Sequence, residues 1–414
     1  MARLFQDIAA LSRVSARKLG MSSRKVLTAL TIMCVVSIVL SGFSVYLMLG
    51  VSQVQQEELN ELQATIDETK SRIAEVESAL SNLTELPDLL ELQERIDLLL
   101  NQTPASIYDS AHRSVVVIRT QVAQGSGFLY GEANLILTNW HVVEDGTEIE
   151  VQFYDGSRKE ASLMGSDPYS DVAVITVPST PSDAKPLHLG DSSELYIGQQ
   201  VVAIGNPLGF TGSLSSGYIS QVNKEIDLEP IVVPVIQLDI TIAPGSSGGP
   251  LLDLSGNVVG ITNAGTAYGF NFAVPSNIVE RVASSLVETG EYEHAFVGFY
   301  GVELNPENIG DLNLLNVEPF QTGILILEVI PDTPAAEAGL QGATETQDSL
   351  GRLAYLARDI ILAVDDYPTP TFAEWSVYIE EHVSAGQKIT LNLWRSGEID
   401  YVVVTTTSRP PYTG

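Results

Sequence analysis

A short glycine-rich segment at residues 245–250 places one serine where it could act as a nucleophile. Its sequence is GSSGGP, and the glycines on both sides allow a tight turn that brings two backbone N–H groups beside the hydroxyl of Ser247. Acyl transfer needs this geometry, because the nucleophile must lie next to donors that stabilise the developing oxyanion. Glycine–serine turns are common, however, so the segment alone only suggests a hydrolytic site.

Two segments upstream of the serine supply the partners that a serine nucleophile needs. His141 lies in TNWHVV at residues 138–143, and Asp171 begins DVAV at residues 171–174, each beside an apolar run typical of a strand. The order along the chain is histidine, aspartate and serine. This is the order of chymotrypsin-type proteases, whereas the nucleophile elbow of an α/β-hydrolase precedes its acid and its histidine.

The elements that must position these residues are short strands. Between residues 114 and 273 brief apolar or alternating runs are separated by Gly, Pro, Asp and Ser, which predicts an all-β barrel or sandwich. An α/β-hydrolase, and so an esterase of that class, would need long helices between its strands. The expected strands are 114–120, 127–130, 135–139, 148–154, 172–177, 200–204, 231–238, 250–254 and 258–261.

A helix at residues 275–290, with Ser276 as its cap and Gly290 as its stop, is expected to close this β domain. A smaller α+β unit follows after a linker near residues 291–295. Its expected strands are 323–330, 359–364, 388–395 and 399–406, and its expected helices are 334–338 and 372–382.

The composition excludes several classes of function. The chain has 414 residues, enough for two or three domains, and a formal net charge of −31 from 21 basic and 52 acidic residues. Such a chain has no broad basic surface for nucleic acid. The acidity fits either a salt-adapted protein or an ordinary extracytoplasmic one. Cys34 is the single cysteine, and no zinc-ligand or dinucleotide motif is present, so we expect no disulfide, metal or organic cofactor.

Residues 26–49 carry no charge and are long enough for a transmembrane helix. A cleaved signal peptide would have a shorter apolar region that ends in a small-x-small site, and none is evident. Basic residues precede the run and acidic residues follow it. We therefore expect a cytoplasmic N-terminus at residues 1–25, a single anchor at 26–50, and an extracytoplasmic remainder.

Residues 51–102 show a heptad pattern. Apolar residues recur at spacings of three and four from Leu59 to Leu83, with Thr69 as the one polar member. Pro87 interrupts the pattern, which resumes at Leu89. The segment is either a solvated helical spacer or a parallel coiled-coil stalk that joins several chains, and we favour the stalk.

With these residues in view, the chain resembles the HtrA family of serine proteases, in particular its membrane-anchored members with one PDZ domain. In the protease domain the resemblance rests on GSGF at 125–128, TNWHVV at 138–143, DVAV at 171–174, IGNPLG at 204–209, PGSSGGP at 244–250 and NFAVPS at 271–276. In the last domain it rests on VIPDTPAAEAGL at 329–340. Departures from the family pattern are Ser246 in place of asparagine, Arg358 in place of glycine, and a longer connection at 341–357.

The resemblance implies a mainly β fold with a chymotrypsin-like double β-barrel protease domain at 103–290 and an α+β PDZ domain at 296–408. It assigns Ser247 as nucleophile, His141 as general base and Asp171 as the residue that orients the histidine. The backbone N–H groups of Gly245 and Ser247 would form the oxyanion hole.

The resemblance also implies a carboxylate-binding loop for C-terminal peptides in the second domain. Phe299, Tyr300, Gly301 and Val302 match this loop, and the peptide would add as a strand beside residues 372–382. The alternative is that Phe299 and Val302 are simply core residues.

The expected function is that of a membrane-anchored, extracytoplasmic serine endopeptidase that degrades misfolded exported proteins under control of its PDZ domain. Residues 242–246 and 261–265, expected to border the primary specificity pocket, are uncharged and suit small or medium apolar side chains. The family resemblance further implies a homotrimer. The alternative is a non-proteolytic, membrane-tethered peptide-binding scaffold or chaperone.

Overall fold

The computed structural model describes residues 28, 32–33, 35–37, 64–75, 102–132, 134–206, 212–226, 231–263 and 271–413. The chain divides into two compact units, residues 1–96 and 97–414.

In the N-terminal unit, residues 64–75 form a helix. Ile66 and Ile73, seven residues apart, are its half-buried positions, while Thr69 is exposed. Most of the expected anchor and stalk lies outside the described residues. Within the residues that are described, no helix has the length and apolarity needed to span a membrane.

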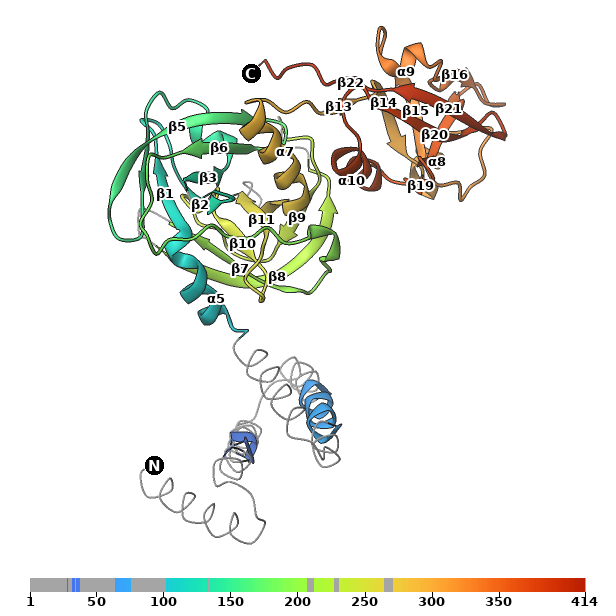
Figure 1. Cartoon of the computed structure of the whole chain (residues 1–414). Helices are drawn as coiled ribbons and strands as arrows, with labels where there is room; N and C mark the ends of the chain where they lie inside the picture. The colour runs from blue at the N-terminus through green and yellow to red at the C-terminus, as the bar shows by residue number, and fades with distance from the viewer. Residues whose placement is uncertain are drawn as a thin grey trace. The chain divides into compact units, whose positions relative to one another are not determined.

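Two closed β-barrels form the larger part of the second unit, and this confirms the predicted double barrel (Figure 1). The first has the strand order β1-β2-β3-β6-β5-β4 and the second β10-β11-β12-β9-β8-β7. The strands are β1 (Val115–Arg119), β2 (Gln124–Tyr130), β3 (Leu135–Thr138), β4 (Ile149–Gln152), β5 (Arg158–Asp167), β6 (Val172–Thr176), β7 (Gln200–Gly205), β8 (Ser213–Lys224), β9 (Val235–Leu238), β10 (Pro250–Leu252), β11 (Val258–Asn263) and β12 (Asn271–Pro275).

Some strands of each barrel, such as β1 and β7, are continuous apolar runs because both of their faces are buried. On β1, Val116 and Ile118 belong to the core inside the first barrel, whereas Val115 packs into a separate core shared with the second barrel. On β7, Val201 and Val202 divide between two cores in the same way. In a sheet with one solvent-exposed face, apolar and polar residues would alternate along each strand. Here successive residues also point to opposite faces, but each face packs into a different apolar cluster.

In the described residues three α-helices accompany the barrels: α5 (Pro104–Ala111), α6 (Trp140–Val143) and α7 (Ser276–Glu288). Helix α7 buries Ile278, Val282 and Leu286 in the core shared by the barrels, and it packs against β5, β6, β11 and β12. The expected cap is displaced by one residue. Pro275 is the N-cap, and the hydroxyl of Ser276 donates instead to the carbonyl of Gly190 at 2.7 Å.

The C-terminal α+β region is built on a mixed-length antiparallel sheet in the order β14-β15-β18-β20-β21, with β19 paired to β18. The strands are β13 (Ala295–Phe296), β14 (Phe299–Glu303), β15 (Ile324–Val329), β16 (Thr344–Gln347), β17 (Leu353–Leu356), β18 (Asp359–Val364), β19 (Tyr367–Pro368), β20 (Lys388–Arg395), β21 (Glu398–Thr405) and β22 (Thr407–Ser408). The helices are α8 (Pro306–Asp311), α9 (Pro334–Glu337) and α10 (Phe372–His382).

The long connection at residues 341–357 contains an ordered hairpin, in which β16 pairs with β17. In the main sheet, Ile324 and Ile361 pair directly, and both are fully buried beneath α10 residues such as Ile379. Strand β14 is an edge strand, since on its other side it pairs with no strand in the described part of the chain.

Candidate active site

His141 lies on α6, immediately after strand β3 of the first barrel. Its Nδ1 is 2.8 Å from Oδ2 and 3.0 Å from Oδ1 of Asp171, and its backbone N–H donates to Oδ1 at 3.0 Å. A neutral imidazole that donates its Nδ1 proton to this carboxylate leaves Nε2 free to accept a proton. The pair therefore has the tautomer that a general base requires.

Asp171 is held rigidly in an unusual conformation. It is 2 % exposed and has a φ of 55°, in the left-handed region that non-glycine residues rarely adopt. Its carbonyl accepts hydrogen bonds from the side chain of Asn139 at 2.8 Å and from the backbone of Trp140 at 3.2 Å. These contacts tie the aspartate to the segment that carries His141, which explains how the strain is maintained.

Asn263, at the end of β11 in the second barrel, is a site residue that the sequence reasoning missed. Its side-chain amide donates to Oδ2 of Asp171 at 2.7 Å. The carboxylate thus receives donors from both barrels. No local signal marks this asparagine, because its partner is 92 residues away in the sequence.

The turn that carries Ser247 lies against the same strand. The hydroxyl of Thr262, next to Asn263, donates to the carbonyl of Ser246 at 3.0 Å, and the N–H of Gly248 donates to the carbonyl of Thr262 at 2.8 Å. Gly248 has a φ of 85°, and a Cβ atom there would lie 2.2 Å from the carbonyl oxygen of Ser126. Only glycine fits at this position.

The first barrel also contacts the serine turn directly. The N–H of Ser126 donates to the carbonyl of Ser247 at 2.7 Å, and its hydroxyl donates to the carbonyl of Gly245 at 2.8 Å. A Cβ atom on Gly125 would lie 2.6 Å from Val142, the neighbour of His141, and 3.0 Å from the carbonyl oxygen of Ser247. The histidine and serine segments therefore meet at Gly125.

The two amides expected to form an oxyanion hole are on this turn. Gly245 has a φ of 93°, and within the described residues its N–H donates no hydrogen bond. Ser247 is 6 % exposed. The geometry leaves the amide of Gly245 available to an incoming carbonyl oxygen.

The environment of His141 sets its basicity. Burial acts to lower its pKa, but the hydrogen bond and negative charge of Asp171 and the charge of Glu144 outweigh burial, so the pKa of His141 is raised above its ordinary value. The imidazole is a stronger base than a free one, and its side chain is still 37 % exposed, so a substrate can reach it.

Comparisons with known proteins agree with this site. Residues 125–261 match the trypsin-like peptidase domain family. The chain is 30 % identical over 352 residues to Protease Do-like 1, chloroplastic, of Arabidopsis thaliana, an alignment that covers 81 % of this chain and 77 % of that protein. The chain belongs to the HtrA family of serine proteases.

Other members extend the likeness. A probable periplasmic serine endoprotease of the DegP-like type from Halomonas elongata is 37 % identical over 286 residues, which cover 68 % of this chain and 56 % of that protein. The chain thus spans about half the length of the DegP-like relatives it matches. The structure of the HtrA-type protease AlgW with a decapeptide has a TM-score of 0.59 and 26 % identity, and covers 75 % of this chain and 100 % of that one.

The C-terminal region of this HtrA protease has a groove of about 440 Å³. Its lining includes Phe299, Tyr300, Trp375 on α10 and Glu380 on α10, together with Tyr169 from the first barrel. The rings of Phe299 and Trp375 meet edge to face at 5.4 Å. One wall is thus formed by residues 295–300, which run into the start of β14, and another wall is formed by α10.

Of the four residues expected in the carboxylate loop, Phe299 and Tyr300 line this groove, whereas Gly301 and Val302 lie farther along β14 and do not. The lining instead continues toward the N-terminus through residues 295–298. Gly298 has a φ of 93°, and a Cβ atom there would lie 2.4 Å from Thr333. This glycine, preceded and followed by apolar residues, was the available signal for the turn.

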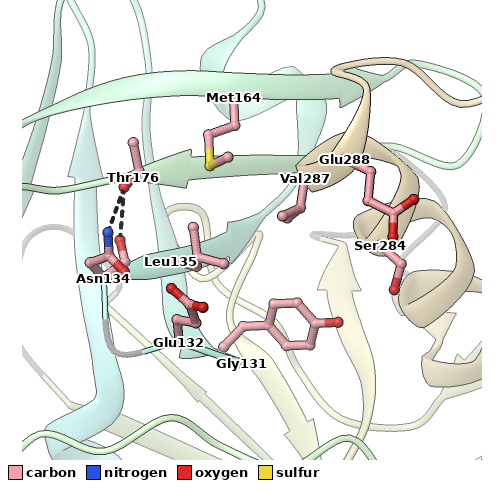
Figure 2. Close-up of a pocket in the computed structure, with 10 residues that line it drawn as sticks. Gly131, Glu132, Asn134, Leu135, Met164, Thr176, Ser284, Val287 and Glu288 are labelled. Atoms are coloured by element: carbon pink, nitrogen blue, oxygen red, sulfur yellow. Dashed lines mark hydrogen bonds between the residues drawn. The ribbon is translucent and has the colours of Figure 1, made fainter.

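A second cavity, of about 480 Å³, lies between the β2–β3 turn, β5, β6 and α7 (Figure 2). Asn134 and Thr176 hydrogen-bond to each other on one side of it, and Met164 and Leu135 contribute apolar surface. It contains no triad residue, so it is separate from the catalytic site.

Proposed function

We propose that this HtrA protein is a serine endopeptidase in which Ser247 is the nucleophile. The contact between His141 and Asp171 at 2.8 Å carries the proposal, because it fixes the imidazole tautomer that can accept the serine proton. Ser247 Oγ attacks the carbonyl carbon of the scissile peptide bond while His141 Nε2 takes its proton. The histidine then gives that proton to the leaving amine, and water hydrolyses the acyl-enzyme by the same route.

The negative charge that develops on the carbonyl oxygen needs donors that are already in place. The N–H groups of Gly245 and Ser247 supply them in this proposal. The fixed turn at Gly248 supports the assignment, because it holds the backbone of the serine segment before substrate arrives.

Unfolded or damaged exported proteins are the proposed substrates. Such chains expose apolar side chains, and the described residues near the expected specificity pocket, Ile242 and Ala243, are uncharged. The uncharged run at residues 26–49 supports a membrane anchor with the protease outside the cytoplasm. DegP-like relatives bear the name of periplasmic endoproteases, which agrees with this location.

The C-terminal region is proposed to be a PDZ domain that binds peptide C-termini. A peptide would pair with the edge strand β14 and lie against α10, and the segment at residues 295–300, which includes the turn at Gly298, would hold its carboxylate. The solved relative with a bound decapeptide supports peptide binding in the family. The half-buried heptad positions Ile66 and Ile73 support a stalk that would suit the proposed homotrimer.

The test is digestion of casein by the intact chain in detergent, beside its Ser247→Ala variant. We expect cleavage by the wild type and none by the variant, with the same circular dichroism spectrum for both. Equal cleavage would remove Ser247 from the mechanism. A folded wild type that holds casein without cutting it would favour the scaffold function.

A further inference from the structure

A second histidine–carboxylate cluster lies outside the catalytic triad. His294, in the segment between the barrels and the C-terminal sheet, has a side chain only 1 % exposed. Its Nε2 is 2.9 Å from Oδ2 of Asp167 at the end of β5, and its Nδ1 is 2.7 Å from Oε2 of Glu380 on α10. Both carboxylates are also buried, with 3 % and 5 % of their side chains exposed.

The geometry fixes the charge of this histidine. A neutral imidazole has only one N–H, whereas here each ring nitrogen faces a carboxylate oxygen that can only accept. Two donated hydrogen bonds therefore require the imidazolium form. Tyr169 and Tyr292 lie edge-on to the ring, with centroids 5.5 and 4.7 Å away, and help to exclude water.

The nearby arginines make other contacts. Arg281 on α7 donates to the backbone carbonyls of Glu380 at 2.9 Å and of Val383 at 3.1 Å, so it fixes α10 without pairing with either carboxylate. The guanidinium of Arg409 lies over the ring of Tyr169, and its backbone N–H donates to the carbonyl of His294.

At one end the cluster organises the loop that carries the catalytic aspartate. Asp167 accepts hydrogen bonds from the backbone N–H of Tyr169 at 3.3 Å and of Ser170 at 2.9 Å, and from the Ser170 hydroxyl. The N–H of Asp171 donates to the carbonyl of Pro168 at 3.3 Å, which closes the turn. The left-handed conformation of Asp171 is thus held by a turn that is built on the Asp167 carboxylate.

At the other end the cluster reaches the groove. Glu380 lines the groove and, through His294, is joined to the turn of Asp171. We propose that His294 is a positioning residue for catalysis, which as an imidazolium holds the Asp167 turn, and hence Asp171, in its active conformation and links that turn to α10. This inference rests on the proposed protease function and adds a residue to it.

The stabilising charge of His294 depends on pH. Burial acts to lower the pKa of His294, but the charges and hydrogen bonds of Glu380 and Asp167 outweigh it and raise the pKa to about 9. Because the folded-state pKa lies above the unfolded one, the contribution of His294 to stability is complete below the ordinary histidine pKa. It is lost as pH rises through about 9. Above that pH two buried carboxylates would compete for one N–H.

The experiment measures kcat/KM for a peptide substrate against pH, across the value of about 9, with the intact chain in detergent. The variants are His294→Gln, His294→Arg and, as a matched control, His188→Gln at an exposed histidine. We expect His294→Gln to lower kcat by roughly 10- to 100-fold at neutral pH with little change in KM, since displacement of a catalytic group is costly. His294→Arg should keep more activity than His294→Gln and lose the fall near pH 9.

A His294→Gln variant with the wild-type kcat and alkaline profile would overturn the inference while leaving the protease function intact. A wild type without Ser247-dependent cleavage would instead contradict the proposed function. Thermal unfolding of the same proteins needs no activity. We expect the wild-type Tm to fall more steeply across pH 9 than that of His294→Gln, and parallel curves would also overturn the inference. If His294→Gln fails to fold, Glu380→Gln keeps the histidine but removes a charge that raises its pKa, so the alkaline fall in kcat should move to lower pH. An unmoved fall would overturn the inference.

Discussion

His141 and His294 are both paired with aspartate in the same fold, yet their surroundings give them opposite tasks. His141 faces one carboxylate and keeps 37 % of its side chain exposed, whereas His294 lies between two carboxylates and is 1 % exposed. One carboxylate strengthens a base that can still release its proton. Two carboxylates around a buried ring hold the proton and convert the histidine into a fixed cation. The number of acceptors thus separates a proton-transfer residue from a positioning residue.

The largest effect should come from changing the aspartate of each pair. Asp171→Asn is expected to lower kcat by about 10⁴-fold, because an amide stabilises the wrong histidine tautomer. Asp167→Asn removes a charge from the second cluster and should cost roughly 10- to 100-fold, since it acts through position alone. Steady-state kinetics on one peptide measure both. An equal fall in kcat for the two variants would contradict the distinction between a proton-transfer histidine and a positioning histidine.

The turn that holds Ser247 can be tested with a pair of glycines. Gly248 and Gly256 have almost the same φ, 85° and 87°, but only Gly248 has backbone within 3 Å of an added Cβ. Gly256→Ala should cost only about 1–2 kcal/mol for the left-handed conformation. Gly248→Ala should add about 1–3 kcal/mol from overlap and remove most activity. Urea unfolding and casein digestion measure the two effects, and similar losses for both variants would contradict this account of the turn.

A smaller effect is expected from the donor that reaches Asp171 across the barrels. Asn263→Ala removes a hydrogen bond to a charged group, a contact worth about 1.5–3 kcal/mol, so kcat should fall on the order of tenfold or somewhat more. Asn257→Ala is the matched control, because its amide contacts Asp253 in a turn away from the triad. Unchanged kinetics for Asn263→Ala would show that His141 alone orients the carboxylate.

The smallest effect concerns the acid limb of the pH profile. His141 must be neutral to act as a base, so kcat/KM should rise as pH increases through its raised pKa. Glu144 contributes to that rise in pKa, and Glu144→Gln should therefore move the acid limb to lower pH with the same plateau. A limb that stays in place would mean that Asp171 sets the basicity without help from Glu144.

The triad could be predicted from sequence because local motifs carry it. Ser247 lies in a glycine-rich segment that predicts a turn, and His141 lies in a short motif that follows an apolar strand. The run of short strands predicts an all-β barrel or sandwich, and the family resemblance implies the double barrel. Strands β5, β8 and β12 were missed. β5 is rich in charged residues and β8 in serine, so neither has the apolar pattern by which the other strands were found.

The second cluster could not be predicted. His294 is 127 residues from Asp167 and 86 from Glu380, and nothing beside it in the sequence marks it as more than a lone histidine. Its role depends on three segments, those of Asp167, His294 and Glu380, which are distant in the sequence and are buried against one another only in the folded protein. For the same reason Asn263 escaped notice. Phe299 and Tyr300 were assigned from the family resemblance, and both line the groove.

The most direct test of the difference between the two histidines is an NMR titration of the intact protein with labelled imidazole carbons. The chain has only five histidines, so single His→Gln variants can assign each signal. We expect His141 to lose its proton first, at a pH above the ordinary histidine value, and His294 to remain protonated until about pH 9. A His294 that is neutral at pH 7, or that titrates before His141, would contradict the account.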